Sequence, residues 1–152
     1  MDGNRSIAVN RKARYEYDIL DSIEAGLVLV GTEIKAIREG RANFSDAYAR
    51  PENGEIWLMN AHISQYSASG GQNNHDPKRA RKLLLHKDQI RRLTRQVDER
   101  GLTLVPLKLY LKRQRAKVEL GVARGRKRHD KRRAIIDRER EKEARMAVRR
   151  GV

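Results

Sequence analysis

The chain has 152 residues, with 35 Lys and Arg against 20 Asp and Glu, a formal net charge of +15 and no cysteine. The lack of cysteine excludes disulfides, thiolate metal ligands and thiol nucleophiles. Its longest aliphatic runs, Leu27–Val30 and Leu83–Leu85, are too short to span a bilayer, and the charged segment Met1–Leu20 lacks the pattern of a signal peptide. We therefore expect a soluble cytoplasmic protein that binds a polyanion and not a membrane.

The beginning of the chain carries two strand patterns and one helix pattern. Met1–Asn10 is polar, and we expect it to be frayed. Tyr15–Leu20 alternates apolar and polar residues and Glu24–Val30 contains β-branched residues, so both segments are expected to form strands. A short helix is predicted at Glu33–Glu39, with Thr32 as its N-cap.

Turn-forming residues organise the middle of the chain. Asp46–Arg50 and Glu55–Asn60 flank the sequence Pro51–Gly54, which predicts a β-hairpin. Ala61–Tyr66 either extends the second arm or bends away from it. Ser67–Pro77 has the composition of a loop.

A strongly basic, amphipathic segment follows this loop. Lys78–Lys82 places four cations in five residues, and Leu83–Arg100 is predicted to be the longest helix, ended by Gly101. The apolar stripe of this helix comprises Leu84, Ile90, Leu93 and Val97, and its opposite face carries Lys87, Arg91, Arg92 and Arg95.

Two further strand patterns complete the folded part. Leu102–Arg113 and Ala116–Val122 alternate, with a tight turn expected at Gln114–Arg115, and Pro106 favours an edge or a bulge. Residues 1–123 are therefore predicted to form one domain that is mainly β, a small antiparallel barrel of the oligonucleotide-binding type with two or three helices. A plain α+β sandwich is the alternative.

The C-terminal segment, residues 124–152, has 13 Lys and Arg against 5 Asp and Glu and few large apolar residues. Too little apolar surface is available to offset the entropy of ordering it, so we expect a basic tail that is disordered when free. Good helix formers in Asp137–Val148 predict that it becomes helical on binding.

The sequence offers little chemistry for catalysis. The four histidines, His62, His75, His86 and His129, are scattered, and no phosphate-binding loop pattern occurs. Glu33, Asp46 and Glu55 could meet around a magnesium ion, but they also fit a helix start, a turn and a strand face. We predict no enzyme, no metal and no cofactor, with an RNA-acting enzyme as an alternative.

Nucleic acid is the predicted partner. Three basic features coincide: the run Lys78–Lys82, the cationic face of the long helix and the tail. Tyr15 follows a basic cluster and is expected to stack on a base or ribose. The remaining aromatic residues are expected in the core on strand periodicity: Tyr17, Phe44, Tyr48, Trp57 and Tyr110.

An ordered set of motifs covers the chain from about Ile7 to Arg133. The motifs are Asn10–Tyr15, Glu24–Leu27, Gly31–Lys35, Arg41–Asn43, Asp76–Pro77, Arg81–Leu85, Leu104–Leu107, Gly121–Lys127 and His129–Arg132. In order and spacing they resemble the SsrA-binding proteins (small protein B, SmpB), which bind transfer-messenger RNA in bacteria. The resemblance implies trans-translation, the rescue of stalled ribosomes, with the barrel in place of the anticodon arm that this RNA lacks.

The resemblance also implies partners and contact residues. The partners are transfer-messenger RNA, the 16S rRNA decoding centre and message channel of the ribosome, and, indirectly through the RNA, elongation factor Tu and alanyl-tRNA synthetase. A ribosomal or ribosome-assembly protein is the rival interpretation. Expected RNA contacts, with the basic cluster before Tyr15 included, are Asn10, Arg11, Lys12, Arg14, Glu24, Lys35, Arg38, Arg81, Lys82, Leu84 and Lys117. Expected contacts with the decoding centre and the root of the tail are Tyr15, Gly125, Arg126, Lys127, His129, Asp130, Lys131 and Arg132.

Overall fold

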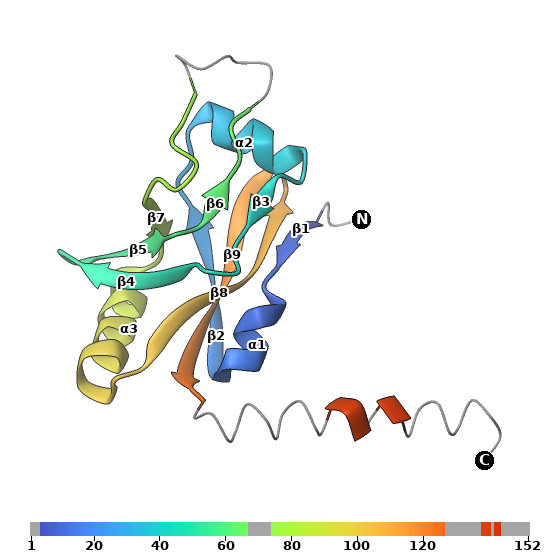
Figure 1. Cartoon of the computed structure of the whole chain (residues 1–152). Coiled ribbons are helices and arrows are strands. Elements are labelled where there is room, and N and C mark those ends of the chain that lie inside the picture. Colours follow the sequence, from blue (N-terminus) through green and yellow to red (C-terminus); the bar gives the residue numbers. More distant parts are fainter. Residues whose placement is uncertain (1–3, 67–73, 127–137, 141, 144–152) are drawn as a thin grey trace.

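The computed structural model describes residues 4–66, 74–126, 138–140 and 142–143 (Figure 1). Its elements between residues 5 and 125 are β1 (Arg5–Val9), α1 (Arg11–Glu16), β2 (Tyr17–Leu27), α2 (Gly31–Arg38), β3 (Ala42–Asn43), β4 (Tyr48–Glu52), β5 (Glu55–Met59), β6 (His62–Ile63), β7 (Arg81–Leu84), α3 (Lys87–Arg100), β8 (Thr103–Lys112) and β9 (Arg115–Gly125). Residues 138–140 and 142–143 are also helical.

The longer strands form one antiparallel sheet that closes on itself. Its order is β1-β8-β4-β5-β7-β2-β9, and β9 also pairs with β8. Six of its seven strands therefore make a closed ring, which β1 joins through β8. The segment after β5 bends away, since β6 pairs with β3 in a separate two-stranded sheet. The predicted oligonucleotide-binding-type barrel is confirmed, and the sandwich alternative is wrong.

Alternating apolar residues fill the barrel. In β8, Leu107, Leu109 and Leu111 are buried, whereas the residues between them are more exposed. The pairing of β8 with β9 changes register between Pro106 and Lys108, which is the predicted bulge. Proline cannot donate a ladder hydrogen bond, so a bulge is where a strand tolerates it.

The N-terminal segment differs from the prediction. Arg5–Val9 is not frayed but is strand β1, because Ile7 and Ala8 pack against the core. Asn10 then begins helix α1 by accepting a 3.2 Å hydrogen bond from the backbone N–H of Ala13. Because Met1–Asn10 is mostly polar, its sequence predicted neither strand β1 nor the cap of α1.

The two strands expected between residues 15 and 30 are one. Tyr15 belongs to α1, and Tyr17–Leu27 forms the continuous strand β2, whose register shift against β9 lies between Ile19 and Asp21. The shift lets a long strand follow the curved barrel wall. Val28 lies beyond its end.

The predicted long helix starts four residues too early. Arg81–Leu84 is strand β7, which lies between β5 and β2, and α3 begins at Lys87. The backbone N–H of His86 donates to Oε1 of Gln89 at 2.9 Å, which closes the start of the helix. Gly101, with φ of 64°, ends the helix as predicted.

Helix α2 has a different start from the one expected. The backbone N–H of Val30 donates to the Glu33 carboxylate at 2.9 Å, so Glu33 closes this end. Thr32 is not the N-cap; its hydroxyl lies 2.8 Å from Nδ1 of His75.

Both predicted hairpins are present. Asn53 and Gly54 turn β4 into β5, and Arg113 and Gln114 turn β8 into β9, one residue earlier than expected, all four with positive φ. Strand β9 continues to Gly125, so the barrel ends two residues beyond the predicted boundary at residue 123. No helix in the described ranges combines the length and apolar character that crossing a bilayer requires.

Candidate nucleic-acid interface

One exposed face of the barrel joins three of the expected RNA contacts. Glu24 lies in β2, Leu84 in β7 and Lys117 in β9. Gly26 of β2 pairs with Leu84 on one side and with Lys117 on the other, so the three side chains share one hollow of about 330 Å³. We call this surface the Glu24 face and define it as Glu24, Leu84, Tyr110, Lys112 and Lys117.

Two neighbours orient the Glu24 carboxylate. The Tyr110 hydroxyl donates a hydrogen bond to Oε2, and Nζ of Lys112 lies 3.6 Å from Oε1. The hydrogen bond from Tyr110 lowers the pKa of Glu24 below its ordinary value, against a smaller opposing effect of burial and with help from Lys112 and Lys117. The carboxylate is therefore ionised at neutral pH, and its free lone pairs can accept hydrogen bonds from base amino groups.

Tyr110 was expected in the core and not at an RNA surface. Its ring lies on the outer face, with Nζ of Lys108 5.7 Å from the ring centroid. Burial, and then Glu24, raise the pKa of Tyr110, which keeps its hydroxyl a donor at neutral pH. The alternation in Leu107–Lys112 indicates this outward position in the sequence itself, because it places Tyr110 on the face opposite the leucines and beside the lysines.

The tip of the β8–β9 hairpin adds positive charge beside Glu24. A second hollow, of about 380 Å³, is lined by Glu24, Lys112, Arg113, Arg115 and Lys117. Four cations around one carboxylate attract phosphates, which contribute affinity, while the carboxylate favours groups that donate hydrogen bonds. The arrangement can thus combine RNA attraction with selectivity.

Leu84 supplies an apolar contact on the same face. It is 54% exposed, which is high for a leucine in a central strand. A Cβ at Gly26 would lie 3.1 Å from Cβ of Leu84, so glycine in β2 leaves the room in which Leu84 lies across the neighbouring strand. A base can pack against such a side chain and remove apolar surface from water.

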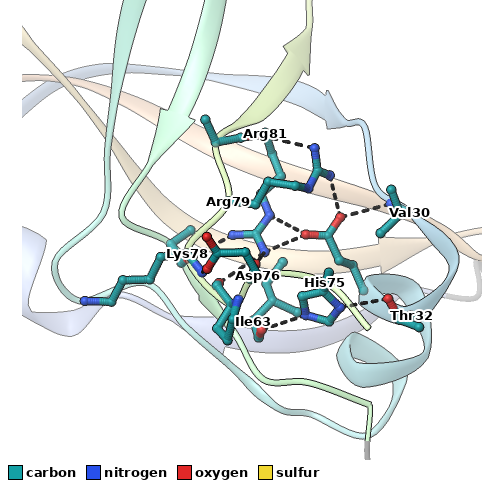
Figure 2. Close-up of polar contacts among 12 residues, drawn as sticks. Val30, Thr32, Ile63, His75, Asp76, Lys78, Arg79 and Arg81 are labelled. Carbon is teal, nitrogen blue, oxygen red and sulfur yellow. Dashed lines mark hydrogen bonds and ion pairs between the residues drawn. The ribbon is translucent and has the colours of Figure 1, made fainter. Parts of the chain in front are cut away.

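The guanidinium of Arg81 is buried in an ion pair. Its side chain is 0% exposed, and its guanidinium pairs with the equally buried Glu33, with Nη2 2.5 Å and Nε 2.6 Å from Oε2. Arg79 approaches the other oxygen, Oε1, at 2.5 Å. Figure 2 shows Arg79, Arg81 and Val30 converging on this carboxylate. The guanidinium is thus enclosed and already paired in this conformation, and the RNA contact at Arg81 stays a prediction.

This buried cluster ties together segments that are distant in sequence. Arg81 also donates to the carbonyl oxygens of Ala61 at 2.6 Å and Pro77 at 3.1 Å. His75 is buried, with Nε2 2.8 Å from the Ile63 carbonyl oxygen and Nδ1 facing Thr32 (Figure 2). The cluster thereby holds residues 74–81 against α2, and so positions β7 and its Leu84 beside β2.

Asn10 is likewise a structural residue. Its side chain is buried, and its amide donates to the carbonyl oxygens of Phe44 at 3.0 Å and Pro106 at 2.8 Å while it caps α1. These bonds hold the side chain inside the protein, and the RNA contact at Asn10 stays a prediction.

A second exposed region forms where α1 meets the ends of β2 and β9 (Figure 1). Arg11, Lys12 and Arg14 are exposed on α1, and Nζ of Lys12 lies 3.1 Å from Asp46. The backbone N–H of Arg126 donates to the Glu16 carbonyl oxygen at 3.0 Å, and its Nε lies 3.0 Å from Asp18. The expected decoding-centre residues Tyr15, Gly125 and Arg126 therefore lie at one end of the barrel.

The remaining candidates lie elsewhere. Lys35 and Arg38 are exposed on α2, at the opposite end of the barrel from α1 (Figure 1), and Nζ of Lys35 lies 5.4 Å from the Tyr66 ring centroid. Lys82 pairs with Glu55 at 3.3 Å. The predictions for Lys127, His129, Asp130, Lys131 and Arg132 lie outside the described residues.

Glu33, Asp46 and Glu55, the three acids considered for a magnesium site, each pair with different cations. Glu33 pairs with Arg79 and Arg81, whereas Asp46 pairs with Lys12 and Glu55 with Lys82. Within the described ranges, no group of three His, Asp or Glu side chains is arranged to hold a metal ion.

Comparison with known proteins places the chain in a family. The family model of the SmpB protein matches residues 7–150. An SsrA-binding protein of Thermosynechococcus vestitus is 53% identical over 97% of both chains, and one of Frankia casuarinae is 56% identical over 90% of this chain and 86% of that one. A solved structure described as "tmRNA-SmpB: a journey to the center of the bacterial ribosome" is 48% identical, covers 84% of this chain and 93% of that chain, and has a TM-score of 0.67. The chain belongs to the SmpB family.

Proposed function

We propose that this protein binds transfer-messenger RNA through the Glu24 face and brings it to stalled ribosomes, so that trans-translation tags the unfinished peptide and releases the ribosome. The observation that carries this proposal is the convergence of Glu24, Leu84 and Lys117 from three strands into one hollow. The SsrA-binding relatives, which match over nearly the whole chain, support the same RNA as the partner.

The two ends of the molecule would have separate tasks. The barrel recognises the tRNA-like part of the RNA and replaces its missing anticodon arm. The end formed by Tyr15, Gly125 and Arg126 faces the 16S rRNA decoding centre, and residues 127–152 continue along the message channel as a helix. The helical residues 138–140 and 142–143 support this last assignment.

We assign the remaining partners by the same reasoning. Elongation factor Tu and alanyl-tRNA synthetase act on the shared RNA and contact the protein only through the complex. The work takes place in the cytoplasm, where the ribosomes are, and the protein binds without catalysing a reaction. A turnover assay with labelled RNA and magnesium tests the last point, with product formation as the contrary result.

Selectivity for RNA tests the function as a whole. Affinity is measured at moderate salt for transfer-messenger RNA and for ribosomal RNA fragments of equal length. We expect clear preference for transfer-messenger RNA, because base contacts add to a phosphate attraction that both share. Equal affinity for both would favour a ribosomal or assembly protein.

A double-proline variant tests the tail. Ile136→Pro and Ala144→Pro each cost a helix about 3 kcal/mol without changing the charge. This variant should bind transfer-messenger RNA normally but fail to tag peptides on stalled ribosomes. Normal tagging would mean that the tail acts as a flexible polycation.

A further inference from the structure

A groove lies between α3 and strands β5 and β7 of the barrel wall. It has a volume of about 870 Å³, and its accessible apolar floor is Leu84 and Leu85, beneath which lie the buried Leu83 and Ile90. We call it the α3 groove. Its other lining residues are Gly54, Glu55, Lys82, Lys87, Arg91, Thr94 and Arg95.

The charge of the groove is strongly positive along one wall. Lys87, Arg91 and Arg95 are each four residues apart on α3, so they form a row with a spacing of about 6 Å along the helix. Lys82 adds a fourth cation to the lining, and among the described residues Glu55 is the one acid in it. A row of evenly spaced cations beside an apolar floor suits a nucleic-acid strand, because the cations can bind its phosphates while its bases pack against the apolar side chains.

The existing ion pairs do not block such a ligand. Arg91 lies 2.9 Å from Asp88 and Lys82 lies 3.3 Å from Glu55, and these side chains are all more than a third exposed. Exposed pairs of this kind contribute little to stability, so phosphates can replace them.

The α3 groove is continuous with the Glu24 face. Leu84 and Leu85 line both the groove and the hollow that holds Glu24 and Lys117. An RNA strand that passes Glu24 therefore meets the same two leucines that line the groove. This continuity favours a segment of the same RNA over a separate protein as the occupant.

We propose that the α3 groove binds an unpaired segment of the RNA that the Glu24 face recognises, with bases against the leucines and phosphates on Lys87, Arg91 and Arg95. The inference rests on the proposed function and adds a second contact to it. Of the exposed arginines of α3, Arg91 and Arg95 line the groove, whereas Arg92 and Arg100 lie outside its lining.

Two matched double variants of the full chain provide the test. Arg91→Ala with Arg95→Ala and Arg92→Ala with Arg100→Ala remove the same charge from the same helix, and alanine preserves helix propensity. Affinity for purified transfer-messenger RNA is measured over a range of salt concentrations. The first double should bind roughly tenfold more weakly and lower the salt slope by about 1.4, as expected for two lost single-strand phosphate contacts. The second should change both much less.

A third variant tests occupancy without changing charge. Thr94→Trp places a large side chain over the groove floor, and we expect it to weaken RNA binding while far-UV circular dichroism remains native. If it misfolds, the two arginine doubles decide alone. Equal losses of affinity in the two arginine doubles would overturn the proposal. Normal RNA binding by the Thr94→Trp variant together with failed peptide tagging would also overturn it, because this result would indicate a protein occupant. Failure of the unmodified protein to bind this RNA would instead contradict the proposed function.

Discussion

Two glutamates surrounded by cations serve different ends in this molecule. Glu33 and its partner Arg81 are fully buried, whereas the Glu24 side chain is 41% exposed beside Lys112 and Lys117. The first cluster connects α2, residues 74–81 and the barrel, while the second faces solvent with lone pairs available. Burial, and not residue type, decides which acid supports the fold and which can contact a ligand.

The physical reason lies in desolvation. A buried ion pair has already lost its water, so removing one partner leaves an uncompensated charge that costs about 3–5 kcal/mol. An exposed pair is worth about 0–1 kcal/mol, so Lys112 and Lys117 can exchange Glu24 for phosphate at little cost. The comparison therefore predicts opposite phenotypes for changes at the two sites.

The largest expected effect is on folding. Glu33→Ala should lower the free energy of unfolding by about 3–5 kcal/mol, because Arg81 then stays buried without its partner. Urea unfolding followed by circular dichroism measures this. The control is Glu33→Ala combined with Arg81→Met, which removes both charges and should recover part of the loss. If Glu33→Ala alone were as stable as the original protein, the structural role assigned to the Glu33 cluster would be contradicted.

Acid should weaken the same cluster. Burial alone would raise the pKa of Glu33, but hydrogen bonds from Arg79 and Val30 and the charge of Arg81 hold it below its ordinary value of 4.5. The pair's contribution is therefore complete above the unfolded pKa and is lost as pH falls through the lower folded pKa. The stability difference between the original protein and Glu33→Gln should shrink as pH falls below about 4.5. A difference that stays constant across this range would contradict the assignment.

The next effect is on RNA selectivity without a change in folding. Glu24→Gln preserves shape but loses the charge, and should cost about 1–3 kcal/mol of preference for transfer-messenger RNA over a ribosomal fragment. Its free energy of unfolding should stay within about 0.5 kcal/mol of the original. Parallel binding and urea experiments check both. Loss of stability with unchanged selectivity would reverse the roles assigned to the two glutamates.

The smallest effect concerns the orientation of Glu24. Tyr110→Phe removes only the hydroxyl, and should weaken selective binding by about 1 kcal/mol. The pKa of Glu24, followed by NMR, should rise toward its ordinary value, because the lost hydrogen bond is the main cause of its lowering. In the Glu24→Gln background the tyrosine change should have little further effect. Fully additive losses would show that Tyr110 acts on RNA independently of Glu24.

The barrel itself could be predicted from local patterns. Turn residues such as Asn53 and Gly54 and the alternation around Leu109 fixed the hairpins, because both are short-range signals. The run Leu83–Leu85 was assigned to the long helix, since a short apolar run fits either structure and only the pairing of β7 with β5 and β2 decides.

The site was less predictable than the fold. Family resemblance supplied Glu24, Leu84 and Lys117 as candidates, but it could not show that Arg81 and Asn10 are buried, because burial depends on which segments fold over them. Tyr110 was absent from the expected RNA contacts for a different reason. Strand alternation in β8 places its ring on the outer face, between Lys108 and Lys112 and opposite the buried leucines.

The most direct test of the central claim is to identify the RNA that the barrel retains in bacterial cells. Residues 1–126 keep all of β9 and the contact between Arg126 and Asp18, so this truncation removes charge without removing the Glu24 face. We expect transfer-messenger RNA to be the main enriched species on sequencing, and the truncated Glu24→Gln, Lys117→Ala variant to lose that enrichment. Equal enrichment in both, or a predominance of ribosomal RNA with the unsubstituted barrel, would contradict the account.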